Sequence, residues 1–205
     1  VLNVGGVVDL SPVMGVRNIL LLSQLGVETG GALADILLGK ANPSGKLTTT
    51  WAAFEEYPEM PDFEDMNETR YREGIYVGYR YFETRYEDYV LGRGNAGDYD
   101  YDKLVAFPFG SGLSYTTFDY SDFKITDQGS TILAEVDVTN TGSVDGKHTV
   151  QIYFQSPYTQ YDIDNGVEKA AVELCGFDKK EIAAGKTEHF AIEIRKDDLT
   201  SYDSN

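Results

Sequence analysis

Few side chains in this sequence have a spacing that could support chemistry, and the segment around Glu28 is the strongest candidate. Residues 26–31 read G-x-E-x-G-G and lie between an apolar segment and a helical pattern. In open α/β sheets, ligands bind in the crevice where a strand passes into a helix, and a helix N-terminus offers free N–H groups. Glu28 is therefore a candidate for contact with a substrate or a neighbouring domain. The alternative is structural, because a carboxylate in the first turn stabilises the helix dipole.

Two other motifs are incomplete. A dinucleotide site needs Gly-x-Gly-x-x-Gly and an acid about 20 residues later, and residues 26–31 have a different glycine spacing. Residues 98–102 imitate the start of a calcium-binding EF-hand loop, but Lys103 and Phe109 stand where that loop needs glycine and glutamate. We therefore expect a solvated acidic loop there, and no bound cofactor.

The histidines and the cysteine predict no metal or catalytic site. His148 and His189 are too few and too far apart for a histidine-based metal centre. Cys175 stands in a strand-like segment without an adjacent basic residue, which favours a small buried side chain over a reactive thiol. The sequence Asn67-Glu68-Thr69 is an N-glycosylation sequon, which matters only on a glycosylating secretory route.

The charge balance narrows the classes of partner. The 205 residues include 17 Lys and Arg against 34 Asp and Glu, a net charge of −17. Nucleic acids and anionic membrane surfaces attract clustered basic residues, and the apolar runs are much shorter than the roughly 18 residues of a spanning helix. We expect neither a nucleic-acid partner nor a membrane partner. The single cysteine and the lack of a visible signal pattern slightly favour the bacterial cytoplasm, although the sequence opens on Val1 and not on Met.

The elements that must position the candidate segment form an α/β pattern over residues 1–51. Apolar segments at 1–4 and 18–25 predict buried strands, and the β-branched residues of 46–51 predict a third. Leucine and isoleucine at helical spacing predict a helix over 29–38 that ends at a glycine. Strand, strand, helix, strand with short connections is an α/β layer pattern.

Residues 52–117 form a connector with two different halves. Eight acids occur over 55–73 together with prolines, which indicates an extended, solvated segment. Seven aromatic residues then occur over 71–89. Because rings at that density need a surface to cover, we expect residues 71–117 to be a strap packed between two domains.

Residues 118–199 alternate between apolar and polar side chains with a period of two. Such a pattern, interrupted by glycine turns, is typical of an antiparallel β-sandwich. Within 131–139 it predicts that Glu135 and Asp137 point outward. The side chains expected to be buried on the opposite face of that strand are Ile132, Ala134, Val136 and Val138.

Five segments, in order along the chain, resemble glycoside hydrolase family 3. VLNVGGVVD at 1–9, GVETGGALADILLG at 26–39 and NPSGKL at 42–47 resemble the end of that family's α/β sandwich domain. YREGIYVGYRYF at 71–82 and FPFGSGLSYTTF at 107–118 resemble its connector and the entry into its fibronectin type III-like domain. The departures are small: Val27 replaces a frequent Gln, and Ser111 a frequent Tyr.

The resemblance implies part of a retaining β-glucosidase-like enzyme. In that family a barrel domain carries the nucleophilic Asp and the α/β domain carries the acid/base Glu, and neither corresponds to a position in this sequence. The implied partners are a carbohydrate substrate and the remainder of the enzyme, including the barrel, possibly as a second chain. No metal and no organic cofactor are implied. The alternative function is a non-catalytic carbohydrate-binding or adhesion module, in which the tyrosines would lie exposed on one face.

The expected organisation has three parts. Residues 1–51 are the end of an α/β sandwich domain, residues 52–117 are the connector strap, and residues 118–205 are an all-β fibronectin type III-like (immunoglobulin-like) sandwich. The resemblance implies a further strand after 199–203, so the sandwich lacks its last strand. We expect either an exposed edge beside 187–195 or a second polypeptide that pairs there.

Overall fold

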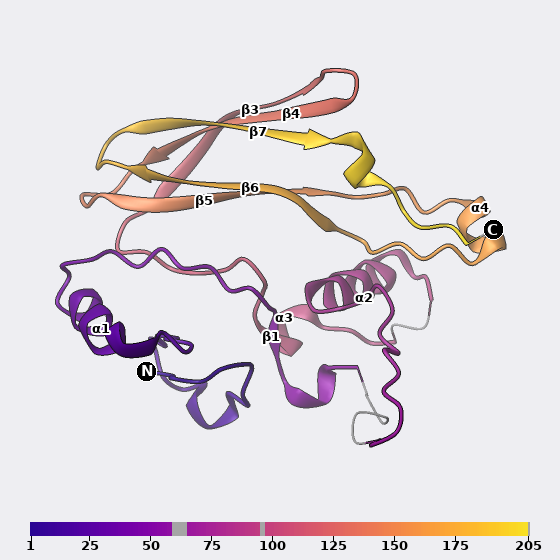
Figure 1. The fold of residues 1–205 in the computed structure, drawn as a ribbon, viewed down its shortest axis with the longest axis horizontal. Helices are drawn as coiled ribbons and strands as arrows, with labels where there is room; N and C mark the ends of the chain where they lie inside the picture. Colours follow the sequence, from indigo (N-terminus) through magenta and orange to yellow (C-terminus); the bar gives the residue numbers. More distant parts are fainter. Residues whose placement is uncertain (59–64, 95–96, 205) are drawn as a thin grey trace.

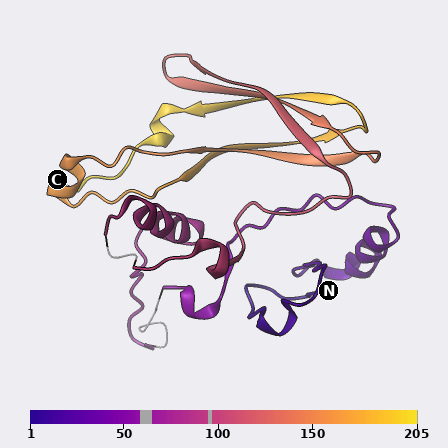
Figure 2. The same ribbon diagram turned by 180° about the vertical axis from the view of Figure 1, so that it is seen from behind.

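The computed structural model describes residues 1–58, 65–94 and 97–204 as mostly β-sheet with a few helices (Figure 1). Two sheets and the N-terminal part form three successive layers, and the two opposite views agree on this order (Figures 1 and 2). The two-stranded sheet formed within residues 146–182 lies in the middle. The three-stranded sheet lies on one side of it, and the N-terminal part lies on the other. None of the helices in the described ranges is long and apolar enough to cross a membrane.

Two antiparallel sheets enclose one hydrophobic core. The first has the order β3-β4-β7, and the second consists of β5 and β6. Their bounds are β3 (Phe118–Asp127), β4 (Thr131–Asn140), β5 (Gly146–Phe154), β6 (Glu173–Ile182) and β7 (Thr187–Arg195). Both sheets contribute to the core, which consists of Ala134, Val136, Val138, Val150, Ile182, Phe190, Ile192 and Ile194. Among the described residues β7 pairs only with β4, so the expected edge beside 187–195 is present.

The period-two prediction for β4 is confirmed with one exception. Ala134, Val136 and Val138 are buried, whereas the intervening Glu135 and Asp137 are partly exposed. Ile132 was expected to be buried and is only half-buried. It lies one residue from the start of β4, where the end of the sheet gives it fewer neighbours.

The α/β layer over residues 1–51 is less regular than predicted. Helix α1 (Thr29–Leu37) forms as expected and is followed by Gly39 at φ +70. The strands expected at 1–4 and 18–25 are reduced to one parallel bridge between Leu2 and Leu21. An apolar run becomes a regular parallel strand only where neighbouring strands and helices cover both its faces, and the described residues give this bridge little cover.

The strand expected at 46–51 is also shorter. Only β1 (Trp51–Ala52) is regular, and it pairs antiparallel with β2 (Val105–Phe107). Before β1, Leu47 N donates to Ser111 O and Leu47 O accepts from Gly110 N, and the Thr50 hydroxyl accepts from Phe109 N. The remaining short elements are 3-10 turns at Ser11–Val13, Gly26–Glu28, Phe54–Glu56 and Lys196–Leu199, and helix α4 (Gln160–Asn165).

The connector is not an extended strap throughout. It contains α2 (Tyr79–Leu91) and the single turn α3 (Tyr101–Leu104). Aromatic residues at helical spacing bury one face of α2, where Phe82 packs with Ala52 and Val105. The sequence prediction missed this helix because it considered how many aromatic residues the segment has and not their helical spacing.

Helix α2 packs against the β5–β6 sheet. The Tyr79 hydroxyl accepts a hydrogen bond from Leu174 N (2.8 Å). The Tyr79 ring stacks on Phe109 with centroids 4.6 Å apart and meets Tyr153 edge-on at 6.1 Å. Tyr71, by contrast, is 83% exposed. The aromatic residues of the connector are therefore divided between the interface and the surface.

A short loop at residues 42–46, the 42–46 clasp, joins the N-terminal part to the sheets. Asn42 Oδ1 accepts hydrogen bonds from Ser114 Oγ (2.9 Å) and Tyr115 N (2.8 Å). Asn42 Nδ2 donates to Asp145 O (3.0 Å). One amide side chain thus ties together three segments that are distant in sequence.

Two lysines and a glycine complete the clasp. Lys46 Nζ donates to Gly112 O (2.7 Å), and Lys179 Nζ of β6 donates to Ser44 O (2.9 Å). Gly112 is packed so tightly that an added Cβ would clash with the carbonyl oxygen of Gly45. The two backbones approach closely because Gly112 carries no side chain.

This contact predicts that Gly112→Ala destabilises the chain by about 1–3 kcal/mol, the usual cost of an extra methyl group in a packed site. The free energy of unfolding from urea titration measures it. Gly45→Ala is the matched control, because a Cβ at Gly45 points into open space. Equal stability of the two variants would show that the backbones separate without cost.

Candidate functional site

Glu28 lies where the sequence placed it, at the entry to α1. The turn Gly26–Glu28 continues directly into the helix, and Thr29 Oγ1 donates to Gly26 O (2.6 Å). The Glu28 side chain is exposed and makes no capping hydrogen bond. The neighbouring Val27 is 99% exposed. A carboxylate with neither a cap partner nor a burial partner is available to a ligand or a neighbouring domain, and its role in substrate contact stays a prediction.

The crevice itself lies beside the parallel bridge. Leu2 N donates to Leu20 O, and Leu22 N donates to Leu2 O, both at 2.8 Å. The residues just after each bridge position form the walls of a cavity of about 250 Å³. It is lined by Val4, Gly5, Gly6, Leu21, Ser23, Lys46, Leu47, Thr48, Thr49 and Trp51. The cavity thus lies at the carboxyl ends of two parallel segments, the position that α/β folds use for ligands.

The lining of the crevice is suited to binding and not to acid–base chemistry. Ser23, Thr48 and Thr49 bring hydroxyl groups, and Ser23 adopts the left-handed conformation at φ +51. The pKa of Lys46 is lowered, mainly by burial and then by the charge of Lys179. The described residues that line the cavity include no carboxylate, and Glu28 is not among them. Sequence reasoning missed these hydroxyl residues because nothing in their spacing marks them.

The two histidines lie in different sheets and have opposite environments. His148 on β5 packs against Phe118 in a tilted arrangement (centroids 4.3 Å apart), and its Nε2 lies 2.5 Å from the Tyr120 hydroxyl. Burial, followed by the charge of Lys46, lowers the pKa of His148 from 6.5 to about 4. His189 on β7 is exposed between two acids. The hydrogen bond that His189 Nδ1 donates to Asp137 Oδ1 (2.6 Å) is the main cause that raises the pKa of His189 above 6.5, and Glu135 adds to it.

The remaining motifs are placed by their local structure. Cys175 lies in β6, packs against the core and donates from Sγ to Ile152 O (3.3 Å), and burial raises its pKa. In the acidic segment 98–102 the aspartates are exposed, but Tyr99 is fully buried. The sequon at Asn67 is exposed. Within the described ranges, no group of three or more side chains could hold a metal ion.

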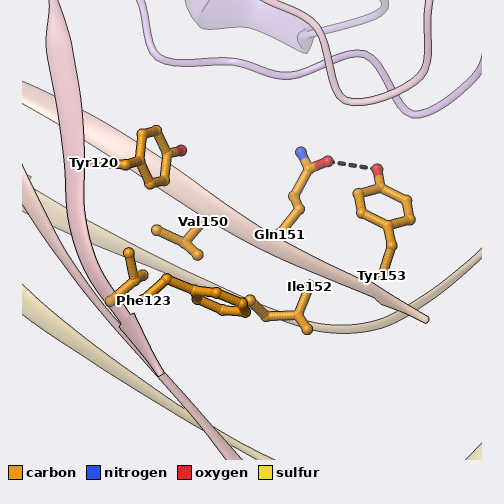
Figure 3. Close-up of a pocket in the computed structure, with 7 residues that line it drawn as sticks. Tyr120, Phe123, Val150, Gln151, Ile152 and Tyr153 are labelled. Carbon is orange, nitrogen blue, oxygen red and sulfur yellow. Dashed lines mark hydrogen bonds between the residues drawn. The ribbon is translucent and has the colours of Figure 1, made fainter. Parts of the chain in front are cut away.

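A second cavity, which sequence reasoning missed, lies between the sheets. It has a volume of about 330 Å³ and is lined mainly by apolar side chains of β3, β4 and β5 (Figure 3). The Tyr153 hydroxyl donates to Gln151 Oε1 (2.6 Å) at its upper rim in that view. The apolar residues of β3 could have indicated it, but a shift in their alternation hides the pattern in the sequence.

Two family descriptions match the chain. Residues 1–79 match the Glycosyl hydrolase family 3 C-terminal domain, and residues 148–205 match the Fibronectin type III-like domain. Among curated proteins, the chain is 38% identical to Beta-glucosidase A of Butyrivibrio fibrisolvens over 99% of its length. It is 36% identical to a beta-glucosidase of Ruminococcus albus over 100% of its length. Both parts of the chain are therefore similar to known proteins.

A solved structure agrees with these relatives. Beta-glucosidase 3B from Thermotoga neapolitana in complex with glucose superposes with a TM-score of 0.80 and 35% identity, and the match covers 98% of this chain. The chain covers 26% of that structure, 25% of the Butyrivibrio protein and 20% of the Ruminococcus protein. It thus spans about a quarter or less of the length of these relatives.

The histidine environments predict a pH dependence of stability. The folded state protonates His148 only near pH 4, whereas the unfolded chain does so near pH 6.5. Stability is therefore lost as the pH falls from 6.5 to 4, because the unfolded state binds more protons. We expect His148→Gln to reduce this loss, as measured by urea unfolding at successive pH values.

His189→Gln is the matched control. The raised pKa of His189 gives stability that is present below pH 6.5 and is lost as the pH rises through its folded value. This variant should therefore leave the slope between pH 6.5 and 4 unchanged and should flatten the curve above pH 6.5. Equal effects of the two variants below pH 6.5 would contradict the assignment.

Proposed function

Because this chain belongs to glycosyl hydrolase family 3, we propose that it supplies the scaffold of a retaining β-glycosidase and the structure beside its active site. The observation that carries the proposal is the joint match of residues 1–79 and 148–205 to the two family descriptions, in a chain that is similar to proteins named beta-glucosidases. The proposed substrates are terminal β-linked glucosides or related sugars. The proposed partner is the remainder of the enzyme, including a barrel domain.

The proposed division of the chain follows its contacts. Residues 1–51 are the end of the α/β sandwich domain, residues 52–117 are the connector strap, and residues 118–205 are a fibronectin type III-like sandwich that lacks at least one strand. The clasp and the packing of Tyr79 support a fixed arrangement of these parts. Such an arrangement suits a scaffold, because a catalytic site needs its supporting elements held in place.

The catalytic pair is proposed to lie outside this chain. A retaining glycosidase needs two carboxyl groups about 5–5.5 Å apart, one of them protonated at working pH. The crevice is lined by hydroxyl groups and an amine. Burial raises the pKa of the Asp88 carboxyl, but Asp88 lies in the last turn of α2 and does not line the crevice. Glu28 could orient a sugar hydroxyl, and alone it cannot serve as both nucleophile and acid.

The binding-module alternative has less support. A carbohydrate platform needs aromatic faces that are open to solvent, whereas Phe82 and Tyr99 are fully buried and Tyr79 packs on Phe109. Tyr71, Tyr86 and Tyr89 are exposed, but Tyr86 packs against Tyr101. The buried rings of the connector therefore favour a strap over a sugar-binding face.

The proposal predicts that the chain alone hydrolyses no nitrophenyl β-glucoside above background, since both catalytic carboxylates are supplied by the remainder of the enzyme. Release of nitrophenol from the purified chain measures this directly. Adding the remainder of the enzyme as a second polypeptide should restore turnover. Activity of the chain alone, lost on Glu28→Gln, would show that the catalytic centre had been misplaced.

In the restored enzyme, Glu28→Gln should lower kcat/KM modestly, by about three- to thirtyfold, which corresponds to the roughly 0.5–2 kcal/mol of one hydrogen bond. Glu188→Gln, an exposed acid on β7, is the matched control and should have no effect. Complete loss of turnover with Glu28→Gln would assign this carboxylate to the chemistry itself. Unchanged kcat/KM would leave it only a structural role.

A further inference from the structure

Three segments that are distant in sequence meet at one end of the β5–β6 sheet and form the α2–α4 junction. They are helix α2, the turn at 72–76 and the loop at 155–172, whose helix α4 lies beyond the end of the sheet (Figure 1). Ala171 N donates to Thr84 Oγ1 of α2 (2.9 Å). A Cβ added to Gly74 would lie 3.6 Å from Glu168 Oε2. The loop therefore packs on both other segments.

The loop at 155–172 is longer than the sheet requires. Strand β5 ends at Phe154, and β6, its antiparallel neighbour, begins at Glu173. A hairpin connection needs only about 2–5 residues. Longer loops that carry packing of their own are frequently functional. The extra residues of this loop therefore call for a role outside the sheet.

A buried carboxylate holds the loop in one conformation. Asp162 is 3% exposed and accepts hydrogen bonds from Thr159 N (2.6 Å) and Thr159 Oγ1 (2.7 Å). It also pairs with Lys169 Nζ (2.8 Å), which donates in addition to Pro157 O (3.0 Å). Because a buried carboxylate that loses its partners is strongly destabilising, the loop keeps this arrangement. The side chains that it displays are therefore fixed in position.

Tyr158 is the aromatic side chain that this loop contributes to the junction. Its ring is 43% exposed, and its hydroxyl is a neighbour of the Tyr76 hydroxyl. Burial is the main cause that raises the pKa of Tyr76 to about 12, and Glu168, Tyr158 and Asp88 add to the rise in that order. The Tyr76 hydroxyl thus has two carboxylates and a second phenol around it, beside an open aromatic ring.

This combination of groups matches the chemistry of a sugar. Carboxylates only accept hydrogen bonds, whereas phenols donate as well as accept. A sugar hydroxyl also donates and accepts, so it satisfies both kinds of group, and the C–H face of the sugar ring can cover an exposed aromatic ring. An organic cation offers donors alone, and the charge of Arg93, which acts on Asp88, opposes it. An anion is repelled by the two carboxylates.

We infer that the α2–α4 junction binds one neutral sugar unit, which stacks on Tyr158 and shares its hydroxyl groups among Tyr76, Glu168 and Asp88. The inference rests on the proposed function, which supplies β-linked glucosides as ligands. It also gives the loop at 155–172 a role that the connection between β5 and β6 does not.

Methyl β-glucoside tests the inference on the chain of 205 residues. Its binding is followed by the amide resonances of the ¹⁵N-labelled chain. We expect saturable binding, with shifts at residues 72–76 and 155–172. Tyr158→Ala should weaken binding about fivefold, the change expected for the loss of one stacked ring. Tyr158→Phe, which keeps the ring and is the gentler change to the fold, should weaken it about threefold through the lost hydroxyl.

Two residues provide matched controls. Tyr161 lies on the same loop and is 56% exposed, but its hydroxyl donates to Asp203 Oδ2 (2.8 Å). Tyr161→Ala should therefore leave the affinity unchanged. Glu168→Gln should weaken binding about threefold through one lost acceptor, whereas Glu188→Gln, at an exposed acid on β7, should have no effect.

Four outcomes would overturn the inference. They are the absence of saturable binding by the folded chain, equal effects of Tyr158→Ala and Tyr161→Ala, shifts confined to the crevice around Ser23, and tighter binding of spermidine than of the glucoside. The last outcome would assign the junction to an organic cation.

The test also separates this inference from the proposed function. If the restored enzyme hydrolyses nitrophenyl β-glucoside but Tyr158→Ala leaves glucoside binding by the chain unchanged, the inference fails and the proposed function stands. If the glucoside binds at Tyr158 but the restored enzyme has no turnover, the proposed function fails and the sugar site stands.

Discussion

The close approach of two glycines holds this chain in one arrangement. Gly112 allows its backbone to touch the carbonyl of Gly45, and this contact brings Lys46 onto Gly112 O and Asn42 between Ser114 and Asp145. Lys46 and the neighbouring Leu47 are at the same time walls of the crevice. The geometry of the candidate site is therefore set by a packing constraint at the junction and not by the few contacts of the N-terminal layer itself.

The junction also explains why two histidines in one sandwich behave differently. His148 lies under the clasp, close enough to Lys46 for its charge to oppose a second positive charge, and Phe118 covers its ring. His189 is on the outer face of the other sheet, where two carboxylates favour its charged form. Burial at the junction thus determines the pKa of His148, whereas neighbouring surface charges determine the pKa of His189.

The sequence allowed good predictions where one local rule determines the structure. The alternation in β4 and the spacing and terminal glycine of α1 are local, and both elements form as predicted. The strands expected at 1–4 and 18–25 depend on neighbours, and they are reduced to one bridge. Helix α2 was missed because its aromatic residues face both the helix's own core and the β5–β6 sheet, so their number drew attention away from their helical spacing. The hydroxyl groups of the crevice and the second cavity between the sheets arise from tertiary packing. The shift in the register of β3 with β4 between Ser121 and Lys124 hides that second cavity from a period-two analysis.

The clasp has a consequence for how the chain reaches its native state. Asn42 and Asp145 are 103 residues apart in sequence, and Ser44 and Lys179 are 135 apart. Closing loops of this length costs conformational entropy before any contact compensates for it, and topologies rich in such distant contacts fold slowly. On a ribosome, the N-terminal layer emerges long before Lys179 exists to fasten it. The 42–46 clasp must therefore stay unfastened until the second half of the sandwich has been made, so the order of synthesis makes this junction a late contact in the folding of the chain.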